Sequence, residues 1–138
     1  MILSDPQIRH ILETAVTVAI VGLSDKPDRD SYRVAEYLQD HGYHIVPVNP
    51  TVESVLGQKS YARVTDIPGQ IDIVDVFRKP DAAPPVVAEA IEARARVVWL
   101  QPGVVNQEAA ETAEAAGLQI VMDRCIKMEH QRLFGQEH

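Results

Sequence analysis

The segment Thr17-Val-Ala-Ile-Val-Gly22 is the most informative about the fold, because it is a short run rich in Val and Ile that ends on a glycine. Four runs of the same kind follow along the chain, at residues 44–48, 72–77, 96–100 and 118–122. The runs are nearly continuous in apolar residues, which is typical of parallel strands that are covered on both faces. The sequence therefore predicts five buried parallel strands.

Segments of helical length separate most of these runs. Ser31 is expected to cap a helix that stops at Gly42, and Asn106 is expected to cap another that stops at Gly117. Further helices are expected over residues 4–14, 84–95 and 129–134. Strand alternating with helix predicts an α/β fold, a Rossmann-like doubly wound five-stranded parallel sheet with helices on both faces. Counted along the chain, the expected strand order is 3-2-1-4-5, with the flavodoxin-like order 2-1-3-4-5 as the alternative.

Length and charge limit the classes of function. A chain of 138 residues predicts a single domain over residues 1–138. The net charge of −7 disfavours nucleic acid as a partner, so an anionic ligand must be held locally. We read neither a signal peptide nor a membrane span, and the expected location is cytoplasmic, with the single cysteine, Cys125, reduced.

In a doubly wound sheet the ligand lies beyond the carboxyl ends of the strands, which directs attention to the loop after the first strand. Gly22 would let the backbone approach a phosphate, and the helix start at Ser31 supplies free N–H groups. The cationic candidates for phosphate are Lys26, Arg29 and Arg33. The loop lacks the G-x-G-x-x-G pattern, because Ser24 and Pro27 occupy its second and third positions. The competing interpretation is that Gly22 only turns the chain and the charges are solvated.

The end of the second strand tests the dinucleotide interpretation independently. An NAD site needs an acid there for the ribose hydroxyls, whereas the chain offers Pro47, Val48, Asn49 and Pro50. This stiff, uncharged segment suits contact with a flat base or a pantetheine-like arm. The competing interpretation is that it is no more than a rigid turn.

Three further features of the sequence bear on possible chemistry. Asp75 interrupts an apolar strand, and we expect an edge position with Arg78 or a loop donor as its partner. Cys125 follows the last strand on the ligand side, where it is either a small buried residue or a thiol able to exchange with a ligand thiol. The histidines, His138 among them, show no zinc-like spacing, so no metal site is expected, and no catalytic residues are assigned.

Six stretches, in order and at matching spacing, carry a resemblance to a known family. They are residues 19–24, 29–35, 42–50, 72–78, 98–103 and 121–125. Over about residues 15–130 the chain resembles the small bacterial coenzyme A-binding proteins of the YccU-like family, which are related to the coenzyme A-binding domain of succinyl-CoA synthetase.

The resemblance implies that coenzyme A or an acyl-CoA binds at the strand ends. By position it implies that Gly22, Leu23 and Ser24 face the ligand, that Lys26, Arg29 and Arg33 hold its phosphates beside Ser31, and that Pro47–Pro50 flank it. Phe77, Arg78 and Gln101 would complete the cleft. The resemblance implies no reaction. An NAD(P)-type oxidoreductase and a coenzyme A-binding subunit of a ligase or acyltransferase remain alternatives, and a homodimer or a partner enzyme remains open.

Overall fold

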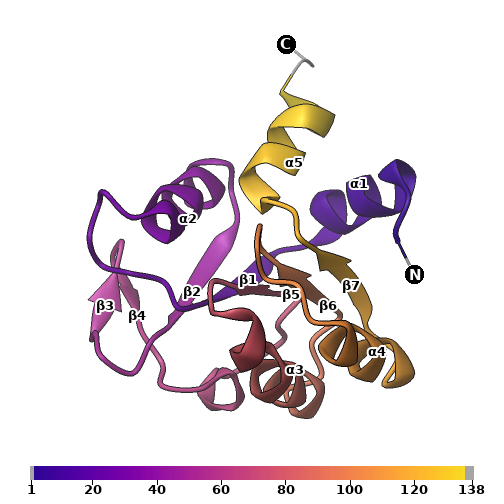
Figure 1. Ribbon diagram of the computed structural model, residues 1–138. Coiled ribbons are helices and arrows are strands. Elements are labelled where there is room, and N and C mark those ends of the chain that lie inside the picture. The colour runs from indigo at the N-terminus through magenta and orange to yellow at the C-terminus, as the bar shows by residue number, and fades with distance from the viewer. Residues whose placement is uncertain (1, 136–138) are drawn as a thin grey trace.

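The computed structural model describes residues 2–135 and contains a parallel sheet of five strands (Figure 1). The strands are β1 (Thr17–Val21), β2 (His44–Val48), β5 (Ile73–Val76), β6 (Val97–Leu100) and β7 (Gln119–Met122). Each one coincides with a predicted apolar run to within two residues at either end. The predicted α/β, Rossmann-like class is confirmed.

Helices cover both faces of this sheet (Figure 1). On one face lie α1 (Asp5–Thr14), α2 (Asp30–Asp40) and α5 (Ile126–Phe134), and on the other lie α3 (Ala83–Glu92) and α4 (Gln107–Ala115). Side chains alternate between two cores: Val74 and Val76 pack toward α3 and α4, whereas Ile73 and Trp99 pack toward α1, α2 and α5. Burial on both faces explains why the strands lack alternating polar residues.

The strand order is β2-β1-β5-β6-β7, which is the flavodoxin-like alternative; the preferred order 3-2-1-4-5 was wrong. The reason lies at the outer edge of β2. Tyr61 takes that edge, because its N–H donates to the Pro47 carbonyl and its own carbonyl accepts from the Asn49 N–H. Tyr61 follows an unpredicted hairpin of β3 (Ser54–Val55) and β4 (Gln58–Lys59). The next long strand, β5, therefore pairs on the other side of β1.

Two helix starts also differ from the prediction. Ser31 is not the cap of α2, because the helix begins at Asp30 and the Ser31 hydroxyl instead accepts a 3.0 Å hydrogen bond from the Ser24 N–H. The last helix begins at Ile126, three residues before the predicted start at Glu129. By contrast, Asn106 caps α4 as predicted, by accepting a hydrogen bond from the Ala109 N–H.

The change of order moves Asp75 from the expected edge to an interior strand. It pairs in register with Ile20 of β1 and Trp99 of β6, and it is fully buried. Neither carboxyl oxygen has a hydrogen-bond partner within residues 2–135, so the expected partner is not found. Burial raises the pKa of the Asp75 carboxyl well above its usual range, because removal from water disfavours the charged form.

Within residues 2–135 the longest helices are far from the length and apolarity that crossing a bilayer requires.

Candidate functional site

The carboxyl ends of β1 and β5 meet in backbone contact. Gly22 has φ of +85°, and a Cβ atom placed on it would lie 2.1 Å from the Phe77 carbonyl oxygen. The Phe77 N–H donates to the Val21 carbonyl at 2.9 Å, and the Gly22 N–H donates to the Val48 carbonyl at 2.9 Å. From β1 the chain crosses one face of the sheet to β2, and from β5 it crosses the other face to β6. This is therefore the point where the winding reverses, where doubly wound sheets bind ligands.

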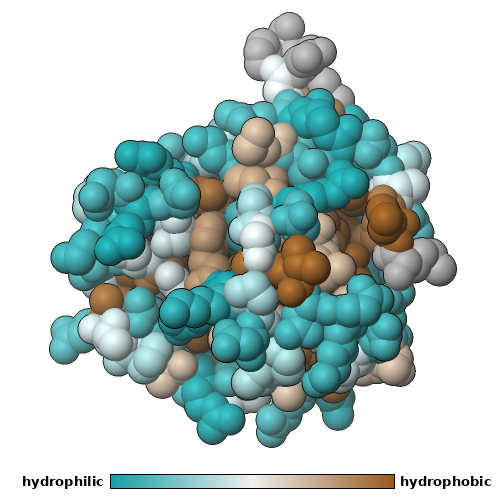
Figure 2. Space-filling view, in the orientation of Figure 1, coloured by the Kyte–Doolittle hydropathy of each residue, from teal (hydrophilic) through white to brown (hydrophobic). Residues whose placement is uncertain are grey.

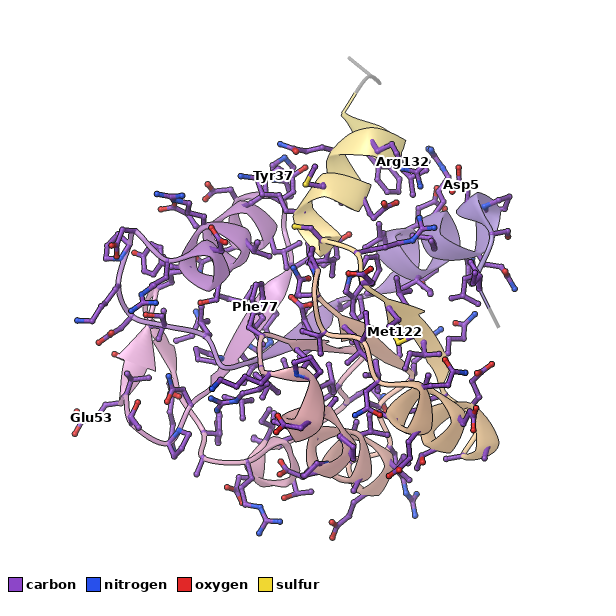
Figure 3. The ribbon with its side chains drawn as sticks, in the orientation of Figure 1. Asp5, Tyr37, Glu53, Phe77, Met122 and Arg132 are labelled. Atoms are coloured by element: carbon purple, nitrogen blue, oxygen red, sulfur yellow. The ribbon has the colours of Figure 1, made fainter. Side chains whose placement is uncertain are left out.

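A cleft of about 490 Å³ opens beside this point, between the first turns of α2 and α5. Phe77 and Gln101 line it from the strand ends; Phe77 lies near the middle of the view in Figure 3. The helices contribute Asp30, Arg33, Val34, Lys127, Met128 and Gln131, and the loops contribute Pro102 and Cys125. Figure 2 shows a hollow next to α2 with apolar surface in its floor and hydrophilic surface around it.

Both helices that frame the cleft begin without a side-chain cap. The N-cap residues are Arg29 for α2 and Cys125 for α5, and neither side chain accepts from the first turn. In α1 and α4, by contrast, Ser4 and Asn106 do. Uncapped N–H groups and the positive end of the helix dipole form a ready site for an anion.

The predicted cations fall into two groups around this cleft. Arg33 lines it and approaches Asp30 at 3.9 Å, with both side chains largely exposed. Arg78 lies over the first loop, with Nε 3.5 Å from the position of a Cβ on Gly22. Lys26 and Arg29 are exposed in the loop itself, and their side chains have no ion pair within residues 2–135. The acids Asp25, Asp28 and Asp30 share this loop, so the local charge is mixed.

Several predicted contact residues have their side chains committed to the protein. Leu23, Pro47 and Val48 are buried, which leaves their backbone alone for a ligand. The Asn49 amide donates to the Leu23 carbonyl at 3.0 Å, and its oxygen accepts from the Thr51 N–H and hydroxyl. Asn49 therefore ties the first loop to the second, while Pro50 is exposed beside it.

Gln101 occupies the floor of the cleft with an unusual hydrogen-bonding state. The residue is 3% exposed, and its Oε1 accepts from the Ile126 N–H at 3.1 Å. Its Nε2 has no partner within residues 2–135 and is not among the fully enclosed polar atoms, so it faces the cleft that Gln101 lines. A buried amide donor directed into a cleft is suited to a ligand carbonyl.

The site prediction placed Cys125 on the ligand side but missed Lys127 and Met128 of α5. All three line the cleft because α5 begins at Ile126, and Trp99 holds this segment by donating from Nε1 to the Arg124 carbonyl at 2.8 Å. A signal was present: Ile126 and Leu133 are seven residues apart and both contact the core, which is the spacing of one helical face.

Other hollows and clusters are lined by residues outside this cleft. One hollow of about 310 Å³, beside β7, is lined by residues of α1, α4 and β7, and its surface is mainly apolar. His130, Tyr37 and His41 form an aromatic cluster between α2 and α5. Residues 2–135 hold no group of three acidic, His or Cys side chains placed for a metal ion, and His138 lies outside the described residues.

Comparison with known proteins gives the family context. The family model described as the CoA binding domain matches residues 16–131. The chain is 45% identical over 127 residues to the protein YneT of Bacillus subtilis (strain 168), covering 92% of this chain and 94% of that protein. A solved structure of a hypothetical protein from Pyrococcus horikoshii OT3 is 48% identical, with a TM-score of 0.94 over 96% of this chain and 94% of that one.

A more distant relative is a subunit of an enzyme. Over 120 residues the chain is 27% identical to the α subunit of an ADP-forming acetate–CoA ligase II from Pyrococcus furiosus. The match covers 79% of this chain and 26% of that subunit.

Proposed function

Because this chain belongs to the CoA binding domain family, we propose that it binds coenzyme A, free or as an acyl-CoA, in the cleft between α2 and α5. The observation that carries the proposal is the convergence of two uncapped helix N-termini on one cleft at the point where the winding of the sheet reverses.

The phosphates fit the side of the cleft next to α2. Arg33 lines the cleft, and Arg78 stands over Gly22 at the entrance to the first loop. Lys26 and Arg29 lie in the same loop and have side chains available for charge-assisted hydrogen bonds. The backbone N–H groups at the start of α2 complete this anion site. Ser24 and Ser31, hydrogen-bonded to each other, hold the loop against the helix.

The pantetheine arm fits the floor of the cleft. Its amides need hydrogen-bond partners, and the free Nε2 of Gln101 offers a donor there. Phe77, Val34 and Met128 supply apolar contact along the same cleft. Pro102 has no N–H to contribute, so in this protein the Gln101 side chain serves as the donor at the end of β6.

A dinucleotide such as NAD fits this site less well. The residue after β2 that would hold the ribose is Asn49, whose amide oxygen already accepts two hydrogen bonds from Thr51. The first carboxylate after β2, Glu53, is exposed at the β3–β4 hairpin. The site therefore favours coenzyme A over NAD. We limit the proposal to binding, because the match to the ligase covers about a quarter of that subunit.

Isothermal titration calorimetry of the purified chain with coenzyme A, NAD and NADP tests this proposal. We expect saturable one-to-one binding of coenzyme A alone. Arg33→Ala and Arg78→Ala should each weaken it by about tenfold and reduce its salt dependence. Arg96→Ala is the matched control, because Arg96 is an exposed arginine at the opposite, amino end of β6.

Two outcomes would overturn the proposal. One is the absence of binding heat and of any rise in melting temperature at millimolar coenzyme A, because a ligand of the native state must stabilise it. The other is an equal loss of affinity in the Arg96→Ala control, which would place the ligand elsewhere or make the effect one of net charge.

A further inference from the structure

Cys125 supplies a thiol to the lining of the proposed coenzyme A cleft. The chain contains one cysteine, and its side chain is free and partly exposed at the N-cap of α5. It lines the same cleft as Phe77 and Gln101. An accessible thiol that lines a cleft can react with a ligand held there.

A second observation points independently to a ligand at this position. The Gln101 side chain is almost entirely buried, yet its Nε2 lacks a partner within residues 2–135, while its Oε1 fixes the N–H of Ile126, the residue after Cys125. One side chain therefore both positions the backbone next to the thiol and presents an unsatisfied donor to the cleft. A ligand that satisfies this donor lies close to Cys125.

The charges and apolar surface around the thiol favour an anionic ligand with an extended arm. Arg33 and Lys127 line the cleft from opposite helices, and Lys127 is held over the Tyr37 ring at 5.6 Å. Asp30 is the acid on the α2 side. The α5 N-terminus adds partial positive charge where the sulfur lies.

We propose that Cys125 forms a reversible mixed disulfide with coenzyme A, by thiol–disulfide exchange with coenzyme A disulfide bound in this cleft. This inference rests on the proposed function. Cys125 first loses its proton to solvent, and its thiolate attacks one sulfur of the bound disulfide. A bond forms between Sγ and that sulfur, the original S–S bond breaks, and the second coenzyme A leaves as a thiolate that takes a proton from water. Cys125 is oxidised and one coenzyme A is reduced, so no further oxidant is required.

Mass spectrometry of the intact protein provides the test. The chain is incubated without reductant with coenzyme A disulfide or with glutathione disulfide at equal concentration. We expect one coenzyme A adduct, mapped to Cys125 and removed by dithiothreitol, that forms at least about tenfold faster than the glutathione adduct, because binding raises the local concentration. Desulfo-coenzyme A, which binds but cannot exchange, should slow the reaction.

A relocated thiol provides the matched control. In Cys125→Ser/Val16→Cys, the cysteine replaces a 63% exposed residue before β1, at the opposite end of the sheet. This thiol should react with both disulfides at similar rates, unaffected by desulfo-coenzyme A.

The two proposals fail in different ways. If calorimetry shows coenzyme A binding but Cys125 reacts no faster with coenzyme A disulfide than the relocated thiol does, the inference is overturned and the proposed function stands. If reduced coenzyme A does not bind at all and desulfo-coenzyme A gives no protection, both are overturned.

Discussion

A Cβ atom on Gly22 would come 2.1 Å from the carbonyl oxygen of Phe77, so the ends of β1 and β5 touch through their backbones. The φ of +85° at Gly22 adds a second requirement for glycine. Gly22 thus serves the fold directly, and a substitution there reports on folding before it reports on any ligand.

Gly22→Ala should destabilise the protein much more than Gly57→Ala. Gly57 also has positive φ, +78°, but a Cβ there meets nothing within 4 Å. The conformational cost of Gly57→Ala is about 1 kcal/mol, and the backbone clash at Gly22 should add at least about 2 kcal/mol. Urea unfolding of both variants measures the difference. Equal losses in the free energy of unfolding would show that the backbone at Gly22 and Phe77 moves apart at no cost in stability.

Asp75 should make stability fall as the pH rises. Burial raises the pKa of this carboxyl in the folded state, so above about pH 4 the unfolded chain has released a proton that the folded chain still holds. The free energy of unfolding should therefore decrease with pH by up to roughly 1.4 kcal/mol per unit, until the raised pKa is passed. Asp75→Asn should remove this slope. Asp75→Leu should remove the slope and also stabilise the protein, by about 1–3 kcal/mol, because no polar atom remains unpaired.

Denaturant unfolding of the three proteins at several pH values from about 4 upward checks this prediction. An Asp75→Leu variant less stable than the wild type at each pH would indicate that the carboxyl is satisfied in solution, for example by buried water.

His130 should produce the opposite slope at acidic pH. Burial, followed by the proximity of His41, lowers the pKa of His130, and its Nδ1 lies 2.7 Å from the Tyr37 hydroxyl. Because its folded pKa is depressed, stability should be lost as the pH falls below about 6.5, the unfolded value. Between pH 7.5 and 5.5, the melting temperature of His130→Asn should fall by a few degrees less than that of the wild type. An unchanged loss would assign the acid sensitivity to other groups.

The Trp99 side chain should affect both the stability of the protein and the binding of coenzyme A in the cleft. Its Nε1 donates to the Arg124 carbonyl, next to Cys125, so Trp99→Phe should cost about 1–3 kcal/mol and also weaken coenzyme A binding. Tyr43→Phe is the control, because the Tyr43 hydroxyl donates to the Leu12 carbonyl on α1, away from the cleft. It should lower stability without changing affinity. Calorimetry combined with urea unfolding separates the two effects, and equal affinities in both variants would contradict this prediction.

An ion pair between α1 and α5 contacts α5 outside the hydrophobic core. Arg132 donates to both carboxylate oxygens of Asp5 at 2.8 Å, and the two side chains point toward one another in Figure 3. The Arg132 guanidinium lowers the pKa of the Asp5 carboxyl. Both groups are exposed, so this pair orients α5 on α1 more than it stabilises the fold.

The positions of the strands and the class of fold that they form could be predicted from the sequence alone. Runs such as Thr17–Val21 and Val97–Leu100 are apolar on both faces, and that pattern is local, because it records how each segment is buried whichever strand is its neighbour. The glycine after β1 and the cations that follow it are also local features, and they directed attention to the end of the sheet beside which the cleft opens.

Which strands and helices are neighbours in space depends on the tertiary structure. Whether β5 pairs with β2 or β1 depends on Tyr61 taking the outer edge of β2, and the burial of Asp75 without a partner follows from that choice. The cleft likewise brings Arg33 together with Lys127, which are far apart in the chain and belong to two helices packed on the same face of the sheet. Contacts of this kind depend on how whole helices and strands pack together. The residue pattern of one segment does not indicate which other segment it packs against.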